Sequence, residues 1–123
     1  KIDHALRHFA IPMAPWRAVG ATHNAFFLEC FLDELAQATR QDPVALRRKL
    51  LAHDARALQV IDAAAEASNW SRAPAKGVAR GFAYFECYGS LCAQVVEATL
   101  ADGQPKVLRV VVALDCGDVV LPD

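Results

Sequence analysis

A turn over residues 15–20, bracketed by proline and glycine, runs directly into Thr22 and an apolar periodic segment. A turn that opens a helix leaves backbone N–H groups without intrahelical partners, at the positive end of the helix dipole. Such groups suit an anion or a metal-oxo ligand. The turn also carries Arg17 beside the large ring of Trp16. This turn is therefore the first candidate for chemistry, although the geometry alone is common.

Each side chain of the turn has a simpler alternative. Arg17 could pair with a carboxylate of the following segment, such as Glu29 or Asp33. Trp16 could wall a site or fill the core. Gly20 could allow a positive φ or a close approach of the backbone to a ligand, or it could serve an ordinary tight turn.

The opening of the helix and Val19 also have two interpretations each. Thr22 is a plausible N-cap, and capping by its hydroxyl is the simpler alternative to amides that face a ligand. Val19 could line a pocket or be a core valine at a turn.

Glu29 and Asp33 lie four residues apart on one helix face, an arrangement that is mildly unfavourable unless cations lie opposite. Arg47 or Arg48 of the next helix could supply the cation. Paired carboxylates can also perform acid/base catalysis, but no polar cleft is indicated around these two. Structural ion pairing is the favoured interpretation.

Metal binding and thiol chemistry have weaker signals. His4 and His8 have the spacing of two ligands on a helix, but their surroundings do not predict a helix and no third ligand stands nearby. The cysteines form no Cys-x-x-Cys pair, and three of the four lie in apolar periodic segments, where small buried thiols are ordinary. We expect all four to be reduced and structural. They are Cys30, Cys87, Cys92 and Cys116.

Three helices are predicted after an extended lead-in over residues 1–21. In the first, apolar residues recur at three and four positions and predict one buried face. Asp42 before Pro43 is an N-cap followed by proline at the first helical position, which predicts a second helix ending near Ala52. Asp54 can cap a third helix that continues until Asn69-Trp70. The buried face predicted for the first helix comprises Phe27, Leu28, Phe31, Leu35 and Ala38, opposite Glu29, Asp33 and Gln37.

The period changes to two after a short linker over residues 71–77. Strands are predicted at about 78–87, 91–100 and 106–115. Residues 88–90 join the first two, and Asp102 with Gly103, a strong hairpin signal, joins the last two. Helices followed by antiparallel strands predict a single α+β domain, with helices over residues 22–70 and strands over 78–116.

Composition excludes several classes of protein. The 123 residues are 54% hydrophobic and 22% charged, which is typical of a globular domain with a core. The formal net charge is −1, so no basic stripe favours nucleic acid. No apolar run approaches the roughly 20 residues that span a bilayer. Because the chain starts at Lys1 and stops at Asp123 after a strand-like run, we expect it to be a piece of a longer protein.

The motifs resemble the large, molybdopterin-binding subunit of the xanthine oxidase and aldehyde oxidase family. The nearest branch is the isoquinoline 1-oxidoreductase beta subunit type, in which a Pro-Trp-Arg-x-Val-Gly turn precedes Asn-Ala-Phe and Asp-Glu-Leu-Ala. The resemblance extends over nearly the whole chain. Its further motifs are Asp42-Pro43, Arg47, Arg80-Gly81, Tyr88-Gly89-Ser90, Leu114-Asp115-Cys116-Gly117 and Pro122.

The resemblance implies a role for each residue of the turn. Arg17 would lie at the molybdenum cofactor with its backbone amide toward the metal's ligands, and Trp16 and Gly20 would belong to the same cofactor-binding site. Val19 corresponds to a position that holds an aromatic ring against the substrate in purine-oxidising members. A valine there implies a differently shaped pocket and argues against purine.

The resemblance also implies the activity, cofactors and partners of the parent protein. It would be an oxidoreductase that hydroxylates an aldehyde or a carbon beside a ring nitrogen, with oxygen from water. The cofactor would be molybdopterin, in its cytosine dinucleotide form, and iron–sulfur clusters would lie on a small partner subunit, because no iron–sulfur cysteine pattern is present here. The family's glutamate base matches nothing in this chain, which should therefore be inactive alone.

Two alternatives stay open. The expected compartment is the cytoplasm, or the periplasm if a signal precedes residue 1. The rival function is a non-catalytic α+β binding or assembly domain, whose exposed apolar strands complete a partner's sheet.

Overall fold

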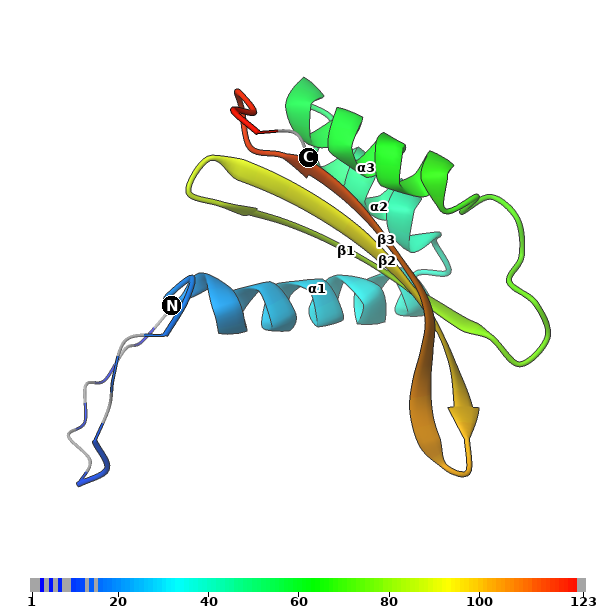
Figure 1. The fold of residues 1–123 in the computed structure, drawn as a ribbon, viewed down its shortest axis with the longest axis horizontal. Helices are drawn as coiled ribbons and strands as arrows, with labels where there is room; N and C mark the ends of the chain where they lie inside the picture. The colour runs from blue at the N-terminus through cyan, green and yellow to red at the C-terminus, as the bar shows by residue number, and fades with distance from the viewer. Residues whose placement is uncertain are drawn as a thin grey trace.

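The computed structural model describes residues 3, 5, 7, 10–12, 14 and 16–121. Three helices precede a three-stranded antiparallel sheet, which confirms the predicted α+β class (Figure 1). The elements are α1 (Ala21–Ala38), α2 (Pro43–Leu50), α3 (Ala55–Ala67), β1 (Ala79–Cys87), β2 (Ser90–Ala101) and β3 (Gln104–Asp115). Pro15, His4 and His8, together with Pro122, lie outside the described residues.

The predicted caps of α2 and α3 are confirmed. Asp42 accepts hydrogen bonds from the amides of Val44 and Ala45, at 3.0 and 2.8 Å. Asp54 accepts from the amides of Arg56 and Ala57, both at 3.0 Å. These bonds satisfy amides that the first helical turn leaves free. Both helices end earlier than predicted, at Leu50 and Ala67.

The sheet has the strand order β1-β2-β3 with two-residue turns. Tyr88 and Gly89 in the first turn, and Asp102 and Gly103 in the second, all have positive φ. This is the backbone of the tight hairpin turns that match strand twist. In β3, Leu108 is an extra residue, because Glu97 pairs with Arg109 and Ala98 with Val107.

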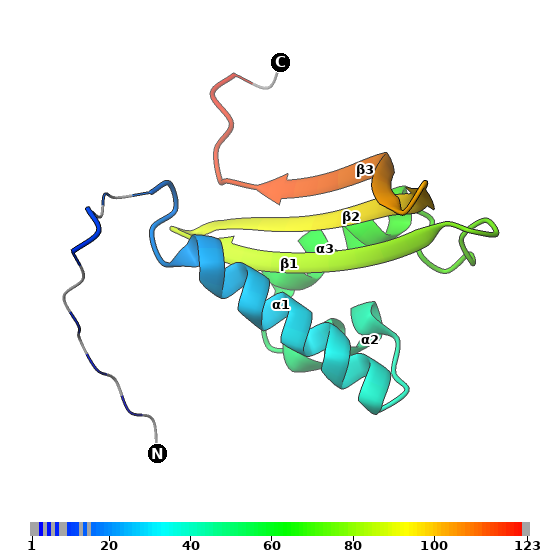
Figure 2. The same ribbon diagram turned by 90° about the horizontal axis from the view of Figure 1, so that it is seen from below.

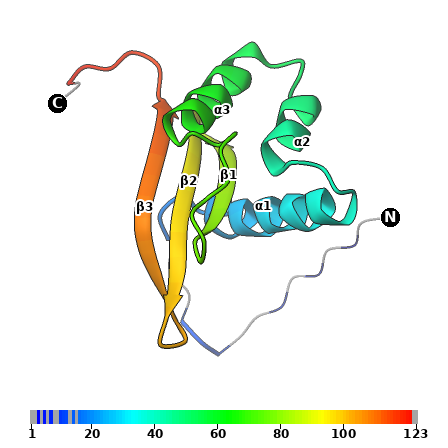
Figure 3. The ribbon, with the colours of Figure 1, turned by 90° about the vertical axis from the view of Figure 1, so that its right-hand side faces the viewer.

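One face of the sheet packs against α2 and α3 and forms the core. The buried residues of the core are Val44, Ala57, Val60, Ile61, Ala64, Ala65, Phe82, Tyr84, Leu91, Ala93 and Val95. Figure 3 shows the three strands side by side, with α1 on the β1 side of the sheet. The core is thus a layer between the sheet and two helices, and α1 lies at its margin.

The buried face predicted for α1 is wrong. Phe27 and Phe31 are 63% and 59% exposed, whereas Glu29 and Ala36 are buried. The helix is apolar over more than one face, so periodicity could not identify which face packs. The ion pair of Glu29 decides the orientation, because it attaches that face to β1 and α2.

Candidate functional site

The turn over residues 16–20 continues directly into α1. Val19 N–H donates to the Trp16 carbonyl at 3.1 Å, and Ala21 N–H donates to the Ala18 carbonyl at 2.8 Å. The Thr22 hydroxyl donates back to the Arg17 carbonyl at 2.5 Å. The predicted N-cap at Thr22 is therefore wrong. Gly20 is the N-cap residue, and Thr22 closes the turn from inside the helix.

The backbone of the turn is left-handed at two residues that carry side chains. Ala18 has a φ of 59° and Val19 a φ of 46°. A positive φ in a β-branched residue is a genuine outlier, and such strain costs about 1 to 3 kcal/mol and concentrates at functional sites. A positive φ at Gly20 was one of the interpretations of this residue, and it is wrong, because the φ of Gly20 is −66°. The positive φ values fall instead at the two preceding residues, Ala18 and Val19.

The side chains of the turn project outward. Trp16 is 76% exposed and Val19 is 66% exposed, so neither fills the core of this chain. Arg17 is exposed as well. Its alternative, an ion pair with Glu29 or Asp33, is not formed, because both of those carboxylates bind Arg47.

The opening of α1 offers free hydrogen-bond donors. Among the described residues, the amides of Thr22 and His23 have no acceptor, and no acidic side chain occupies the first helical turn. Free amides at the positive end of a helix, next to an exposed arginine, favour an anionic group. The donors present in this turn therefore fit an anionic cofactor.

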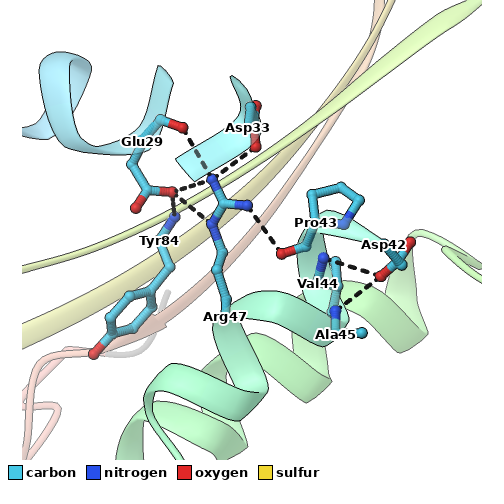
Figure 4. A network of polar contacts seen from close by, with 8 residues as sticks. All are labelled: Glu29, Asp33, Asp42, Pro43, Val44, Ala45, Arg47 and Tyr84. Atoms are coloured by element: carbon cyan, nitrogen blue, oxygen red, sulfur yellow. Dashed lines mark hydrogen bonds and ion pairs between the residues drawn. The ribbon is translucent and has the colours of Figure 1, made fainter. Parts of the chain in front are cut away.

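A buried ionic network holds the middle of α1 (Figure 4). Arg47 is 1% exposed. Its Nε donates to Glu29 Oε2 at 2.9 Å, and its Nη2 lies 2.8 Å from the same oxygen and 2.9 Å from Asp33 Oδ1. Its Nη1 donates to the Pro43 carbonyl at 3.0 Å. The structure thus confirms that Arg47 is the cation that pairs with Glu29 and Asp33. Arg48 pairs instead with Asp62.

The same carboxylate also reaches the sheet. Tyr84 N–H donates to Glu29 Oε2 at 2.7 Å. Since β1 is an edge strand, the Tyr84 amide has no neighbouring strand on its outer side, and Glu29 supplies its acceptor. Burial raises the pKa of Glu29, against the lowering effects of the Tyr84 amide and of Arg47. The Glu29 carboxylate thus binds only Arg47 and the Tyr84 amide among the described residues, which supports a structural role over acid/base catalysis.

The network determines where the turn lies. Glu29 fixes α1 against β1 and α2, and the turn is the N-terminal extension of α1. Few other contacts attach α1, since most of its large apolar side chains are exposed. The position of Arg17 relative to the sheet therefore depends on the Glu29–Arg47 pair.

The cysteines differ from expectation in their burial. All four are free, but none is fully buried. Cys30 and Cys116 are exposed, because Cys30 lies on α1 beyond the packed face and Cys116 follows the last strand. Within the described ranges, no three His, Cys, Asp or Glu side chains are grouped to hold a metal ion. No helix in the described part of the chain combines the length and apolar character needed to cross a membrane.

Three tertiary contacts had no counterpart in the predicted pairings. Asp42 Oδ2 accepts from Trp70 Nε1 at 2.8 Å, so this cap also binds the segment after α3. The Arg80 guanidinium lies 4.3 Å from the centre of the Trp70 ring. Arg56 binds Asp115 through Nε at 2.5 Å and Nη2 at 2.7 Å. The Asp42–Trp70 and Arg56–Asp115 partners are 28 and 59 residues apart in sequence, and no local signal identifies them.

The class of site described here is an exposed, strained turn with free donors at the start of a helix. Comparison with curated proteins finds similarity to a nicotinate dehydrogenase subunit of Pseudomonas putida, with 36% identity over 130 aligned positions. The alignment covers 89% of this chain and 11% of that protein. The chain thus spans about a tenth of the length of this relative. No family model matches the chain, and no solved structure matches it.

Proposed function

We propose that this chain is part of a molybdenum hydroxylase of the xanthine oxidase and aldehyde oxidase family. The observation that carries the proposal is its similarity to a nicotinate dehydrogenase subunit along 89% of the chain. The turn over residues 16–20 supports it, because strain, exposure and free amides coincide there. The isoquinoline 1-oxidoreductase beta subunit type is the branch we propose.

The substrate class we propose is an aldehyde or an N-heteroaromatic ring, oxidised with oxygen from water. Nicotinate is a pyridine carboxylate, so the relative's name supports the heteroaromatic alternative. When bound, the molybdenum cofactor would supply the redox chemistry of this hydroxylation. The 123 residues alone are expected to be inactive, because the resemblance assigns the catalytic base to sequence outside them.

The turn would bind the cofactor through this chain's own donors. Arg17 and the free amides of Thr22 and His23 would face its anionic groups, and Trp16 and Gly20 would shape the same surface. Val19, exposed beside them, would line the substrate pocket. A valine in place of an aromatic ring favours a substrate other than a purine.

The remaining features of the parent protein are also proposals. The cofactor would be the cytosine dinucleotide form of molybdopterin. Iron–sulfur clusters would lie on a small partner subunit that removes the electrons. The proposed compartment is the cytoplasm, with the periplasm as the alternative.

Metal analysis of the parent protein tests the proposal. The full-length protein, purified from its own host with its copurifying subunits, is expected to contain about one molybdenum per large chain, with iron on a smaller partner. Arg17→Ala keeps the backbone amide of residue 17 but removes the exposed guanidinium, so it is expected to lower turnover by about tenfold or more without loss of folding. Arg72→Ala, which removes an exposed arginine after α3, is the matched control.

The rival function is a non-catalytic assembly domain, and the unpaired outer edge of β3, which could extend a partner's sheet, favours it. Soluble, well-folded parent protein without molybdenum would contradict the hydroxylase and support this rival. Equal turnover of the Arg17→Ala and Arg72→Ala variants would contradict the assigned site alone.

A further inference from the structure

The face of the sheet opposite α3 is apolar and largely uncovered. Strand register places its side chains in three rows of three, which we call the open face. Figure 2 looks toward this face, with α1 beside β1 and with α3 behind the sheet. The open face comprises Gly81, Ala83, Phe85, Cys92, Gln94, Val96, Val110, Val112 and Leu114.

The open face carries no charged side chain, whereas the helix-covered face carries several. None of the nine open-face residues is charged. The charged side chains that alternate with these residues along the strands all lie on the opposite, helix-covered face. They are Arg80, Glu86, Glu97, Arg109 and Asp115. An antiparallel sheet with one face in water normally has polar residues there, so this pattern indicates a second buried face.

The apolar surface is widest along β3. Val110, Val112 and Leu114 are 52%, 55% and 62% exposed. Their outer strand edge is also unpaired, because β3 ends the sheet. On the opposite margin, small residues of β1 leave room between the sheet and α1.

That room is a groove of about 710 Å³. From α1 it is lined by Phe26 and Cys30, among others, and from the sheet by Phe85 and Val96. The acidic side chains of Glu29 and Asp33 also line it, but both carboxylates bind Arg47. The groove therefore presents an apolar, preformed cleft that continues onto the open face.

We propose that the open face and this groove are covered by an apolar segment of the same polypeptide, outside residues 1–123. This inference rests on the proposed function, in which the chain is part of a larger enzyme. The similar dehydrogenase subunit extends far beyond the aligned region, which is 11% of its length. A parent chain of similar length would have ample sequence to supply a second layer.

The character of the surface favours a permanent, intramolecular occupant over a separate partner. Surfaces that bind and release partners carry polar and charged groups at their rim, whereas permanent interfaces resemble a domain core cut in half. The open face has one polar side chain, Gln94, and no charge. Covering it would complete a second hydrophobic layer on the sheet.

Thiol labelling of the full-length parent protein tests this inference. Cys92 lies on the open face, and Val112→Cys adds a thiol at a position that is more exposed in this chain. Both are alkylated with iodoacetamide under native conditions and read by peptide mass spectrometry. We expect both to react at least about a hundredfold more slowly than a free thiol, because labelling requires local opening. Gln59→Cys, on the exposed side of α3, reports reagent access.

Three results would overturn the inference. Reaction of Cys92 and Val112→Cys within tenfold of a free thiol would show an uncovered face. Protection that disappears on dilution would assign the face to a second copy. Protection that requires the small subunit would assign it to that partner. Labelling is independent of molybdenum content, so failure here leaves the metal analysis as a separate test of the proposed function.

Discussion

Arg47 is the residue on which the position of α1 depends. It is buried and contacts two carboxylates and the Pro43 carbonyl, and its guanidinium lies 5.7 Å from the Phe82 ring centre. A buried ion pair is weak evidence for stability, because desolvation opposes the attraction. Removing one partner is nevertheless costly, since it leaves the other charge buried. The main role of the Glu29–Arg47 ion pair is therefore to fix how α1 packs against α2.

Arg47→Leu is expected to destabilise the chain by about 3 to 5 kcal/mol at neutral pH. The pKa of Glu29 already lies above its usual 4.5, and loss of Arg47 raises it further. A carboxyl with a raised folded pKa stabilises the fold below pH 4.5 and loses that contribution as pH rises through the raised value. Urea unfolding of the 123-residue chain should therefore show a steeper loss of stability with rising pH in the variant.

Two controls accompany this prediction. Arg48→Leu removes an exposed ion pair with Asp62 and should cost only about 0 to 1 kcal/mol. Adding Glu29→Gln to Arg47→Leu should abolish the extra pH dependence. Identical pH profiles for wild type and Arg47→Leu would contradict the interpretation.

At the scale of elements, helices α2 and α3 begin with equivalent aspartate caps but have different tertiary contacts. The Asp54 carboxylate accepts from amides of its own helix. Asp42 uses one oxygen for its helix and the other for the indole N–H of Trp70. Trp70 in turn packs edge-on against Phe82, with ring centres 5.7 Å apart. Asp42 therefore links the start of α2 to the core.

Asp42→Ala is expected to cost more than Asp54→Ala. Loss of a cap costs about 1 kcal/mol in either helix. Asp42→Ala should cost about 1 kcal/mol more, because the Trp70 indole loses its acceptor. Denaturation midpoints of the two variants measure the difference. In the Trp70→Phe background the difference should disappear, and equal costs in the unmodified chain would refute the link.

At the scale of the whole molecule, one ion pair connects the start of α3 with the end of β3. Arg56 binds both oxygens of Asp115, and it donates to the Gly89 carbonyl at 3.0 Å. Asp115 also accepts from the Gly117 amide at 2.9 Å. These bonds hold three separate segments at one end of the sheet. The bonds from Arg56 and Gly117 also lower the pKa of Asp115 to about 2.

Acid unfolding should reveal the Asp115 contribution. Its folded pKa of about 2 lies below the usual 3.8, so its stabilisation is present above pH 3.8 and is lost as pH falls through about 2. Asp115→Asn should lower stability near neutral pH and flatten the acid limb between about pH 4 and 2, measured by circular dichroism. Asp62→Asn, at an exposed pair with one hydrogen bond, is the control. An unchanged acid limb in Asp115→Asn would contradict this assignment.

Local chemistry made much of the fold predictable. Asp42 with Pro43, and Asp54, start helices because their carboxylates satisfy nearby amides. Asp102 with Gly103 reverses the chain because both residues tolerate positive φ. The period of two after the linker predicted the strand that contains Phe82 and Tyr84, and both residues are buried in β1. Each of these signals acts over a few residues.

The candidate site was predictable only in its location. The spacing of proline, arginine and glycine placed the turn before α1, but not the left-handed backbone at Val19. The predicted ion pairing of Glu29 and Asp33 with an arginine of the next helix was confirmed, but the burial of Glu29 was not foreseen. Its partners come from α2 and β1, and their positions are set by packing of the whole sheet.

The amino-acid sequence by itself thus determined where helices, turns and strands form, because caps, turn residues and periodicity act between neighbours. Only the tertiary structure decided which face of α1 is buried, because that helix is apolar around much of its surface. It also decided that the sheet has one covered face and one apolar open face. That outcome depends on which helices pack against the strands, and no local pattern in β1, β2 or β3 specifies it.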